Sequence, residues 1–380
     1  MQRPSMNVSF YDFVSLHHSE FQQKVMESFQ KIVSSGQFIE GEYNTAFEKE
    51  FASYHQRKHA LLVANGTDAL ELSLRAQGIS HGDKVAVPAV TFYATAEAVY
   101  SEKAEVVLVD IDETGQMDPF SLERVLKQHP EIKSIMPVHL YGIPAPIEEF
   151  EKVIEKSGRN ISIVEDGAQA FGGLYSGEKY KGKRLGSSPH LHTFSFYPTK
   201  NLGAAGDAGA ILVDDEEMML KLKALRNHGR GVEEKIFGRN SRCDHLQAAF
   251  LYHKWQEVEK FQQQRKEVAH QYQELLGGIS SIQVVARNFM ETSSFHLFPI
   301  LTKDGKEKIA LRDFLQEKKI STSLFYEHSL AHEMPLKGVK GEYAFADKFC
   351  QRVLCLPIHP FLTKEQLDYV ASSLRSFYGI

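Results

Sequence analysis

The chain lacks two features that are typical of many secreted and membrane proteins, abundant cysteines and a long apolar segment. Its 380 residues include three cysteines and one tryptophan. Cys243, Cys350 and Cys355 form no CxxC pair, and three thiols cannot build a disulfide framework for a chain of this length. No segment approaches the about 18 consecutive apolar residues of a membrane helix, and the N-terminal sequence MQRPSMNVSFYDF has no long apolar core. These absences predict a cytoplasmic protein.

A large excess of charge of either sign is also absent. The chain has 44 Lys and Arg against 49 Asp and Glu, a net charge of -5. We therefore expect no overall basic surface for nucleic acid or anionic lipid. A hydrophobic content of 42% and a charged content of 24% exclude an intrinsically disordered chain. The length allows two or three domains with a large core.

Short apolar runs alternate with segments of helical period, which is typical of an α/β sheet covered by helices. Seven runs are predicted as strands, most of them buried on both faces: 59–64, 84–88, 105–110, 134–138, 161–165, 193–196 and 209–213. Helices are predicted over 68–77 and over 119–128, where Asp118 is a plausible N-cap before Pro119. Later segments predict helix over 247–276, a strand at 294–301, and helices near 306–319 and 363–378. We predict a large domain over residues 1–245, including the N-terminal segment, and a smaller C-terminal α/β domain over 246–380.

Several suggestive patterns lack a required feature. Residues 177–183 (GEKYKGK) match the spacing GxxxxGK, but Arg184 stands where a Ser or Thr must bind Mg²⁺, so a solvated, lysine-rich hairpin is predicted. Residues 203–209 (GAAGDAG) lack the GxG of a dinucleotide site. Two histidine pairs have no third ligand at a metal spacing and are interpreted as ordinary histidines: His17 with His18, and His190 with His192. No metal site is predicted.

A possible anion site lies in residues 60–74 (ALLVANGTDALELSL). An apolar strand ends at Asn65, Gly66 and Thr67 form a turn, and a helix follows at once. Free N–H groups and the helix dipole at such a point attract anions. Taken alone, the pattern favours the alternative that Thr67 or Asp68 is only a helix N-cap.

Two later motifs each place one reactive side chain. In VEDGAQAFG (164–172), a buried strand ends at Asp166, three residues before Gln169. A carboxylate there suits a buried cation such as a protonated pyridine nitrogen, although it could equally cap a helix. In TFSFYPTKNLGAAGDAGA (193–210), Lys200 follows an aromatic strand and a proline turn among small residues. A partly buried lysine can lose its proton and form a Schiff base, whereas most lysines are solvated surface cations.

The three motifs together supply what pyridoxal 5'-phosphate requires: a phosphate grip, a partner for the pyridine nitrogen and an anchor for the aldehyde. They also occur within a sequence that resembles the DegT/DnrJ/EryC1/StrS family of sugar aminotransferases, which have the aspartate aminotransferase fold. The resembling blocks cover nearly the whole chain: SGQFIEGEYNTAFEKEFASY (35–54), NGTDAL (65–70), GDKVAVPAVTFYATAEAV (82–99), PVHLYG (137–142), EDGAQAFG (165–172), SFYPTKNLGAAGDAGA (195–210), RNHG (226–229), NSRCDHLQAAFL (240–251) and CLPIHPFLTKEQ (355–366).

The resemblance implies a fold type I transferase, with a large, mostly parallel sheet domain and a smaller C-terminal α/β domain. It implies that Lys200 is the catalytic residue, which holds the cofactor and then shuttles a proton. Asp166 would keep the pyridine nitrogen protonated. The remaining cofactor contacts implied are the phosphate ligands Gly66, Thr67 and Ser195, Gln169 near the ring hydroxyl, Phe92 stacked on the ring, and Asn240 from the neighbouring subunit of a homodimer.

The reaction implied is transfer of an amino group, with L-glutamate as donor, to a keto group of a dTDP- or UDP-linked hexose, with the 3-keto position favoured over the 4-keto. Such products are amino sugars for surface glycans, including lipopolysaccharide. A regulatory or sensor protein that binds the cofactor without turnover is the alternative, although no basic helix-turn-helix segment is evident in the sequence.

Two positions depart from the family pattern. Thr199 stands where a glycine usually precedes the lysine, and Phe325, Tyr326 and Glu327 replace a usual His-Tyr-Pro. The second segment contacts the sugar nucleotide in relatives, so the identity of the substrate stays open. Arg230 and Tyr326 are candidate substrate contacts.

Overall fold

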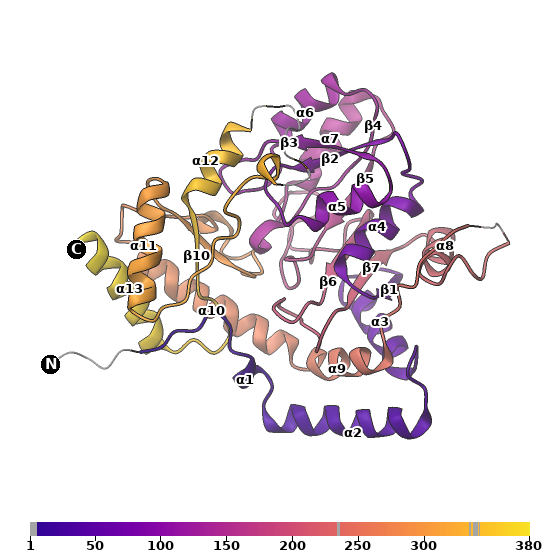
Figure 1. Cartoon of the computed structure of the whole chain (residues 1–380), viewed down its shortest axis with the longest axis horizontal. Coiled ribbons are helices and arrows are strands. Elements are labelled where there is room, and N and C mark those ends of the chain that lie inside the picture. The colour runs from indigo at the N-terminus through magenta and orange to yellow at the C-terminus, as the bar shows by residue number, and fades with distance from the viewer. Residues whose placement is uncertain (1–5, 234–235, 334–335, 337–340, 342) are drawn as a thin grey trace.

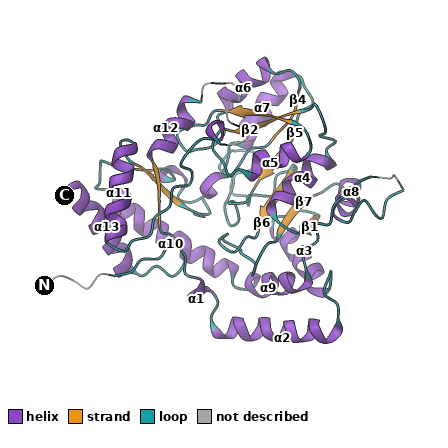
Figure 2. Ribbon diagram, viewed as in Figure 1, coloured by secondary structure: helices purple, strands orange, loops and turns teal. Residues whose placement is uncertain are grey.

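The structure is a computed structural model that describes residues 6–233, 236–333, 336, 341 and 343–380. It contains a large seven-stranded sheet with helices on both faces, and a smaller three-stranded sheet near the C-terminal helices (Figures 1 and 2). The strands of the large sheet are β1 (His59–Val63), β2 (Lys84–Pro88), β3 (Glu105–Val109), β4 (Ile132–Ile135), β5 (Ser162–Asp166), β6 (Leu191–Ser195) and β7 (Gly209–Val213). The α/β fold class predicted from the sequence is confirmed.

The large sheet is mostly parallel. Its strand order is β1-β7-β6-β5-β4-β2-β3, and β7 runs antiparallel to both of its neighbours. The pairs β6 with β5, β5 with β4, β4 with β2, and β2 with β3 are parallel. Ligands of open parallel sheets bind beyond the carboxyl ends of the strands, which in β5 is Asp166.

Helices cover both faces of this sheet, as the continuous apolar strands require. The helices of the first part of the chain are α1 (Phe13–Leu16), α2 (Ser19–Ser35), α3 (Glu42–Tyr54), α4 (Gly66–Ala76), α5 (Ala94–Ser101), α6 (Pro119–Gln128), α7 (Ile147–Ser157) and α8 (Glu216–Arg226). Buried residues of α4, α5 and α8 pack on the face that carries Val63, Val87 and Val164. Those of α3, α6 and α7 pack on the face that carries Leu62 and Ile163.

The second part of the chain is helical around a small antiparallel sheet, ordered β10-β9-β8. Its elements are α9 (His245–Trp255), α10 (Val258–Leu276), β8 (Gln283–Val284), β9 (Phe298–Leu301), α11 (Gly305–Glu317), α12 (Ala344–Arg352), β10 (Val353–Leu356) and α13 (Lys364–Tyr378). No helix in the part of the chain that the structure describes is long and apolar enough to cross a membrane.

The N-terminal segment crosses from one part of the molecule to the other. Val8 forms a parallel bridge with Ile320, and its N–H group donates to the carbonyl of Lys319 at 2.9 Å. From there the chain passes Tyr11 and enters α1 and α2; α2 lies along the outer edge of the molecule and contacts α9 (Figure 1). The helix α9 contacts α3 as well, and its buried Leu251 belongs to the core under the large sheet. The domain division at residue 245 stays a prediction.

Local sequence explains where several elements begin and end. The predicted N-cap Asp118 accepts a hydrogen bond from the Ser121 N–H at 2.7 Å, and Thr363 forms a capping box at the start of α13. The strand predicted at 134–138 instead ends at Ile135, shortly before Pro137, which has no N–H for the ladder. The helix predicted over 247–276 is interrupted at residues 256–257 and forms α9 and α10.

Candidate active site

Lys200 lies in the loop between β6 and β7, beyond the carboxyl end of the large sheet. Burial lowers the pKa of its ammonium to about 8, and the nearby carboxylate of Asp166 opposes this shift. Lys200 and Asp166, the predicted partners of the cofactor's aldehyde and of its pyridine nitrogen, are therefore close enough to interact electrostatically. About one tenth of an amine with this pKa is unprotonated at pH 7, far more than for a solvated lysine, which favours a role as nucleophile or proton shuttle.

Asp166 is held from two sides at the end of β5 and is only 4% exposed. Its carboxylate accepts hydrogen bonds from the Thr95 hydroxyl at 2.8 Å and from the Ala168 N–H at 3.0 Å. No helix follows it, so the helix-cap alternative is wrong. Thr95 was not identified from the sequence. The one sequence feature that could have indicated it is its spacing of four residues from Thr91, whose hydroxyl lies 2.9 Å from that of Thr95 and is hydrogen-bonded to it.

The start of α4 and the end of β6 form a narrow cradle. The cap of α4 is Asn65, whose side chain accepts from the Asp68 N–H at 2.7 Å, so the alternative that Thr67 or Asp68 is the cap is wrong. Within the described chain, the N–H groups of Gly66 and Thr67 donate to no protein group. A Cβ on Gly66 would lie 2.7 Å from the Ser195 Cβ and 3.1 Å from its hydroxyl oxygen. Two free N–H groups beside a hydroxyl at a helix start suit a phosphate.

Gly66→Ala tests this cradle. The added methyl group must displace Ser195, so we expect cofactor affinity to fall at least about tenfold, with a loss of about 1–3 kcal/mol in the free energy of unfolding from overpacking. Equilibrium titration of the apoprotein measures the first effect and urea unfolding measures the second. Gly278→Ala is the matched control, because a Cβ there meets no atom within 4 Å. Equal affinities in the two variants would contradict a phosphate site at Gly66.

The structure also brings Tyr326 and Phe92 to the candidate site. The Gln169 side-chain amide donates to the Tyr326 hydroxyl at 3.2 Å, and its carbonyl oxygen accepts from the Tyr141 N–H at 2.6 Å. The Phe92 ring is 59% exposed and its centroid lies 6.4 Å from that of Tyr326. The Tyr141 hydroxyl donates to the carbonyl of Phe325. The segment that departs from the family pattern is thus fixed beside Gln169 and Phe92.

The other two predicted contacts, Asn240 and Arg230, are exposed in the single chain. Asn240 is bridged to Asn227, and its side-chain oxygen accepts from the Arg242 guanidinium at 3.0 Å. The Arg230 N–H donates to the Asn227 carbonyl. Their roles stay predictions, as do those of the cofactor contacts above.

A polar cluster that the sequence did not predict lies behind β5. Ligand atoms of His139, Glu165 and His192 lie within 4.8 Å of one another and all three are buried, so His192 does have two such neighbours. The Nδ1 atom of His139 accepts from the Ala145 N–H at 2.9 Å, which leaves the proton on Nε2, and Nε2 donates to Glu165 at 2.9 Å. Tyr175 also donates to Glu165. We interpret the cluster as a hydrogen-bonded polar core, because the His139 lone pair needed by a metal is already used.

The lysine-rich segment 177–183 forms the predicted hairpin-like loop. Leu174 and Arg184 form an antiparallel bridge at its base, and the Tyr175 N–H donates to the Lys183 carbonyl at 2.8 Å. Lys179 pairs with Glu151 on α7. The predicted absence of a disulfide framework is also consistent with three free, buried cysteines.

The pKa of Lys200 predicts how the apoprotein responds to pH. Only the unprotonated amine attacks an aldehyde, and burial lowers its pKa to about 8. The attachment rate of pyridoxal 5'-phosphate should therefore rise about tenfold for each pH unit below about 8 and level off above it. Stopped-flow absorbance from about pH 6 to about pH 10 measures this rate. A rate still climbing steeply at the top of that range would contradict the lowered pKa.

Comparison with known proteins gave consistent matches over nearly the whole chain. Residues 19–375 match the family model described as the DegT/DnrJ/EryC1/StrS aminotransferase family. The chain is 34% identical to a pleiotropic regulatory protein of Geobacillus stearothermophilus, with 98% of this chain and 99% of that protein covered. It is 33% identical to the dTDP-3-amino-3,4,6-trideoxy-alpha-D-glucose transaminase of Streptomyces venezuelae, with 97% and 96% covered. Its structure matches that of S. venezuelae DesV in complex with a ketimine intermediate, with a TM-score of 0.90, 32% identity and 98% of both chains covered.

Proposed function

Because the chain belongs to the DegT/DnrJ/EryC1/StrS aminotransferase family, we propose that it is a pyridoxal 5'-phosphate-dependent aminotransferase that acts on a nucleotide-linked keto sugar. The observation that carries this proposal is that the buried Asp166 lies near enough to Lys200 to influence its pKa, which burial lowers to about 8. An aldehyde anchor and a partner for a pyridine nitrogen are then present in one site. The Gly66 cradle supplies the third requirement.

The cradle binds and orients the cofactor. The Gly66 and Thr67 N–H groups and the Ser195 hydroxyl would hold its phosphate at the positive end of α4. The close approach of Gly66 to Ser195 leaves no space for a side chain at position 66. These N–H and hydroxyl groups would hold the phosphate end of the cofactor, and Asp166 and Lys200 would act on its ring nitrogen and its aldehyde.

Asp166 and Lys200 would hold and transfer the protons of the reaction. When bound, the cofactor supplies an aldehyde carbon and a ring that accepts electrons. Asp166, kept in place by Thr95 and the Ala168 N–H, would hold a proton on the pyridine nitrogen. The Lys200 amine would take a proton from the α-carbon of the amino donor and deliver it to the C4' carbon of the cofactor. Its pKa of about 8 allows the amine both to accept and to release a proton.

The substrate is inferred from the family and its members. We infer L-glutamate as the amino donor and a dTDP- or UDP-linked hexose as the acceptor, with the 3-keto position favoured. The similar S. venezuelae enzyme, whose name specifies a dTDP-3-amino sugar, supports this choice. A ketimine contains a carbon–nitrogen double bond, so the complex of DesV supports amine chemistry for this fold. The product would be an amino sugar for a surface glycan made in the cytoplasm.

We further infer a homodimer with shared sites. Met26, Phe29 and Val33 follow one another at helical spacing on α2 and are 64%, 45% and 50% exposed. The helix α2 itself lies along the outer edge of the molecule (Figure 1). Such a stripe suits an interface with a second copy. Asn240 is exposed and its side-chain oxygen accepts from Arg242, so its amide N–H groups would be the atoms that reach the phosphate in the partner's site.

A single experiment tests the proposed reaction. Purified holoenzyme is incubated with L-glutamate and a panel of 3-keto and 4-keto hexoses linked to dTDP or UDP, and 2-oxoglutarate formation is followed. We expect turnover with a 3-keto acceptor. If no amino donor changes the absorbance of the bound cofactor, the aminotransferase proposal is wrong.

A regulatory protein that binds the cofactor without turnover is the second candidate. The similarity to a pleiotropic regulatory protein over 98% of this chain favours it. The same incubation separates the two proposals. An enzyme would form many molecules of 2-oxoglutarate per protein molecule, whereas a sensor would bind the cofactor and respond to a ligand without such turnover.

A further inference from the structure

The loop from residue 198 to residue 203 that carries Lys200 is closed on itself. The Lys200 N–H donates to the Tyr197 carbonyl at 2.8 Å, and the Ala204 N–H donates to the Phe196 carbonyl at 2.7 Å. A Cβ on Gly203 would lie 2.4 Å from the Pro198 carbonyl oxygen, so the two ends of the loop touch. The direction of the Lys200 side chain therefore depends on how this compact loop is fixed to the rest of the protein.

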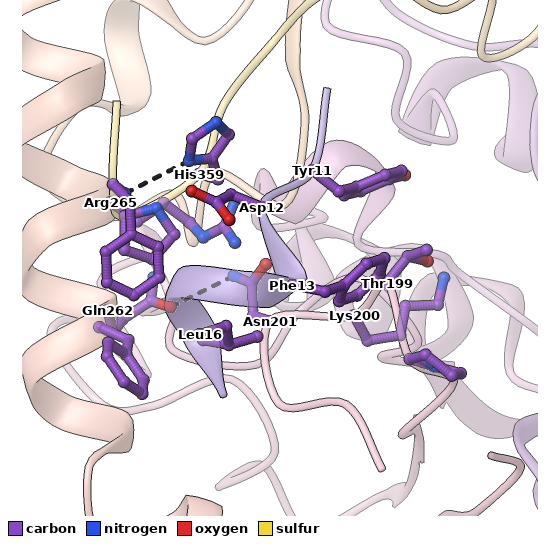
Figure 3. Close-up of a pocket in the computed structure, with 14 residues that line it drawn as sticks. Tyr11, Asp12, Phe13, Leu16, Thr199, Lys200, Asn201, Gln262, Arg265 and His359 are labelled. Carbon is purple, nitrogen blue, oxygen red and sulfur yellow. Dashed lines mark hydrogen bonds between the residues drawn. The ribbon is translucent and has the colours of Figure 1, made fainter. Parts of the chain in front are cut away.

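One side of the loop is fixed through Asn201. Its side-chain amide donates to the carbonyls of Ser294 at 2.9 Å and Phe171 at 3.3 Å, and to the side chain of Gln262 on α10 at 3.2 Å. Figure 3 shows Asn201 turned towards Gln262, whereas the Lys200 amine extends away from Gln262 and Arg265. These bonds hold the middle of the loop against α10.

The other side of the loop is fixed by a second lysine. Lys254, near the end of α9, is 2% exposed and its ammonium donates to the Gly203 carbonyl at 2.9 Å. Among the residues that the structure describes, Lys254 forms no ion pair with a carboxylate. Burial, and to a smaller extent the charge of Arg265, lowers its pKa to about 7. Burying an amine without an anion is unfavourable, and a methionine would fill the same space without that cost.

We propose that Lys254 is a positioning residue for Lys200: by donating to the Gly203 carbonyl it fixes the closing end of the loop, so that the Lys200 amine is held on the Asp166 side of the site. This inference rests on the proposed function. Lys254 itself is no candidate for the aldehyde anchor, because its amine is buried and bonded within the protein. A low pKa alone would not separate the two lysines, but their positions do.

The test compares Lys254→Met with Lys260→Met, the same change at an exposed lysine of α10. Each apoprotein is loaded with pyridoxal 5'-phosphate, and total binding is measured by equilibrium dialysis. Borohydride then reduces any carbon–nitrogen double bond to a stable amine, and peptide mass mapping gives the fraction of bound cofactor fixed to Lys200. In Lys254→Met we expect this fraction to fall at least fivefold while total binding changes less than threefold, because the Gly66 cradle is untouched. Lys260→Met should match the wild type.

The outcomes are distinguishable. A purely structural role for Lys254 would reduce total binding and thermal stability together and leave the fixed fraction unchanged, which would overturn the inference. If Lys254→Met does not fold, Lys254→Gln, whose shorter side chain stops short of Gly203, is measured in the same way, and an unchanged fraction there overturns it. If the wild type fixes no cofactor to Lys200, the proposed function itself fails. If the fraction of bound cofactor fixed to Lys200 is equally high in the wild type and in Lys254→Met, only the proposed role of Lys254 is wrong.

Discussion

Lys200→Ala is expected to lower turnover by at least about 10³-fold, within the range lost when a general acid–base is removed. The amine is the group whose pKa is lowered to about 8 in the site, and alanine can neither bind the aldehyde nor move a proton. The absorbance band of the lysine-bound cofactor should vanish, while the phosphate grip at Gly66 and Ser195 retains the free cofactor. Steady-state kinetics and absorbance spectra measure the two effects.

The control for this variant is Lys183→Ala. Lys183 is an exposed lysine of the hairpin-like loop over residues 177–183, so its loss should leave both turnover and spectrum unchanged. Added methylamine should restore part of the activity of Lys200→Ala, because it supplies the missing amine. Full turnover in Lys200→Ala would assign the chemistry to another residue.

Asp166→Asn is expected to lower turnover by about 100- to 1000-fold, similar to the loss of a group that stabilises charge in a transition state. Asparagine keeps the shape of the side chain and can still accept from Thr95, but it cannot stabilise a proton on the pyridine nitrogen. The spectrum of the bound cofactor should shift to that of a neutral pyridine at a lower pH than in the wild type. Kinetics and a pH titration of absorbance measure these changes.

Two comparisons separate charge from position. Thr95→Val removes the hydroxyl that holds Asp166 but keeps the charge, so we expect a smaller loss, about tenfold, in accord with one hydrogen bond to a charged group. Asp313→Asn, a change at an exposed carboxylate of α11, should have no effect. If Asp166→Asn loses less activity than Thr95→Val, the negative charge is not what the position contributes.

Most of the large sheet was predictable because its strands are apolar on both faces and separated by strong helix signals. Asp118 and Pro119 marked the start of α6 correctly. The small sheet was harder to predict. The strand predicted at 294–301 is confined to Phe298–Leu301, and β10 follows α12 directly at Val353. These short strands depend on pairing between distant segments, for which a single sequence offers little periodicity.

The sequence draws attention to candidate site residues where one residue type can carry the chemistry alone. Asp166 ends β5, Gly66 begins α4 and Lys200 lies in the loop after β6, and the structure brings them to the same edge of the sheet. Thr95 and Lys254 were missed because each acts through a neighbour. Lys254 had one signal: it lies three residues after Leu251 on the buried face of α9, where a lysine is unusual. Glu165 was overlooked because the prediction concerned only Asp166. Successive residues of a strand point to opposite faces, so Glu165 lies on the other face of β5.

The bridge between Val8 and Ile320 has a consequence for biosynthesis. Tyr11 and Asp12, which follow Val8, form part of the wall of the pocket behind Lys200, together with His359 near the other end of the chain (Figure 3). That wall cannot form before residues 359–361, which complete it, have been synthesised. All strands of the large sheet precede His359 in the chain, so the surroundings of the reactive amine are completed only after the segment that contains His359 has been synthesised.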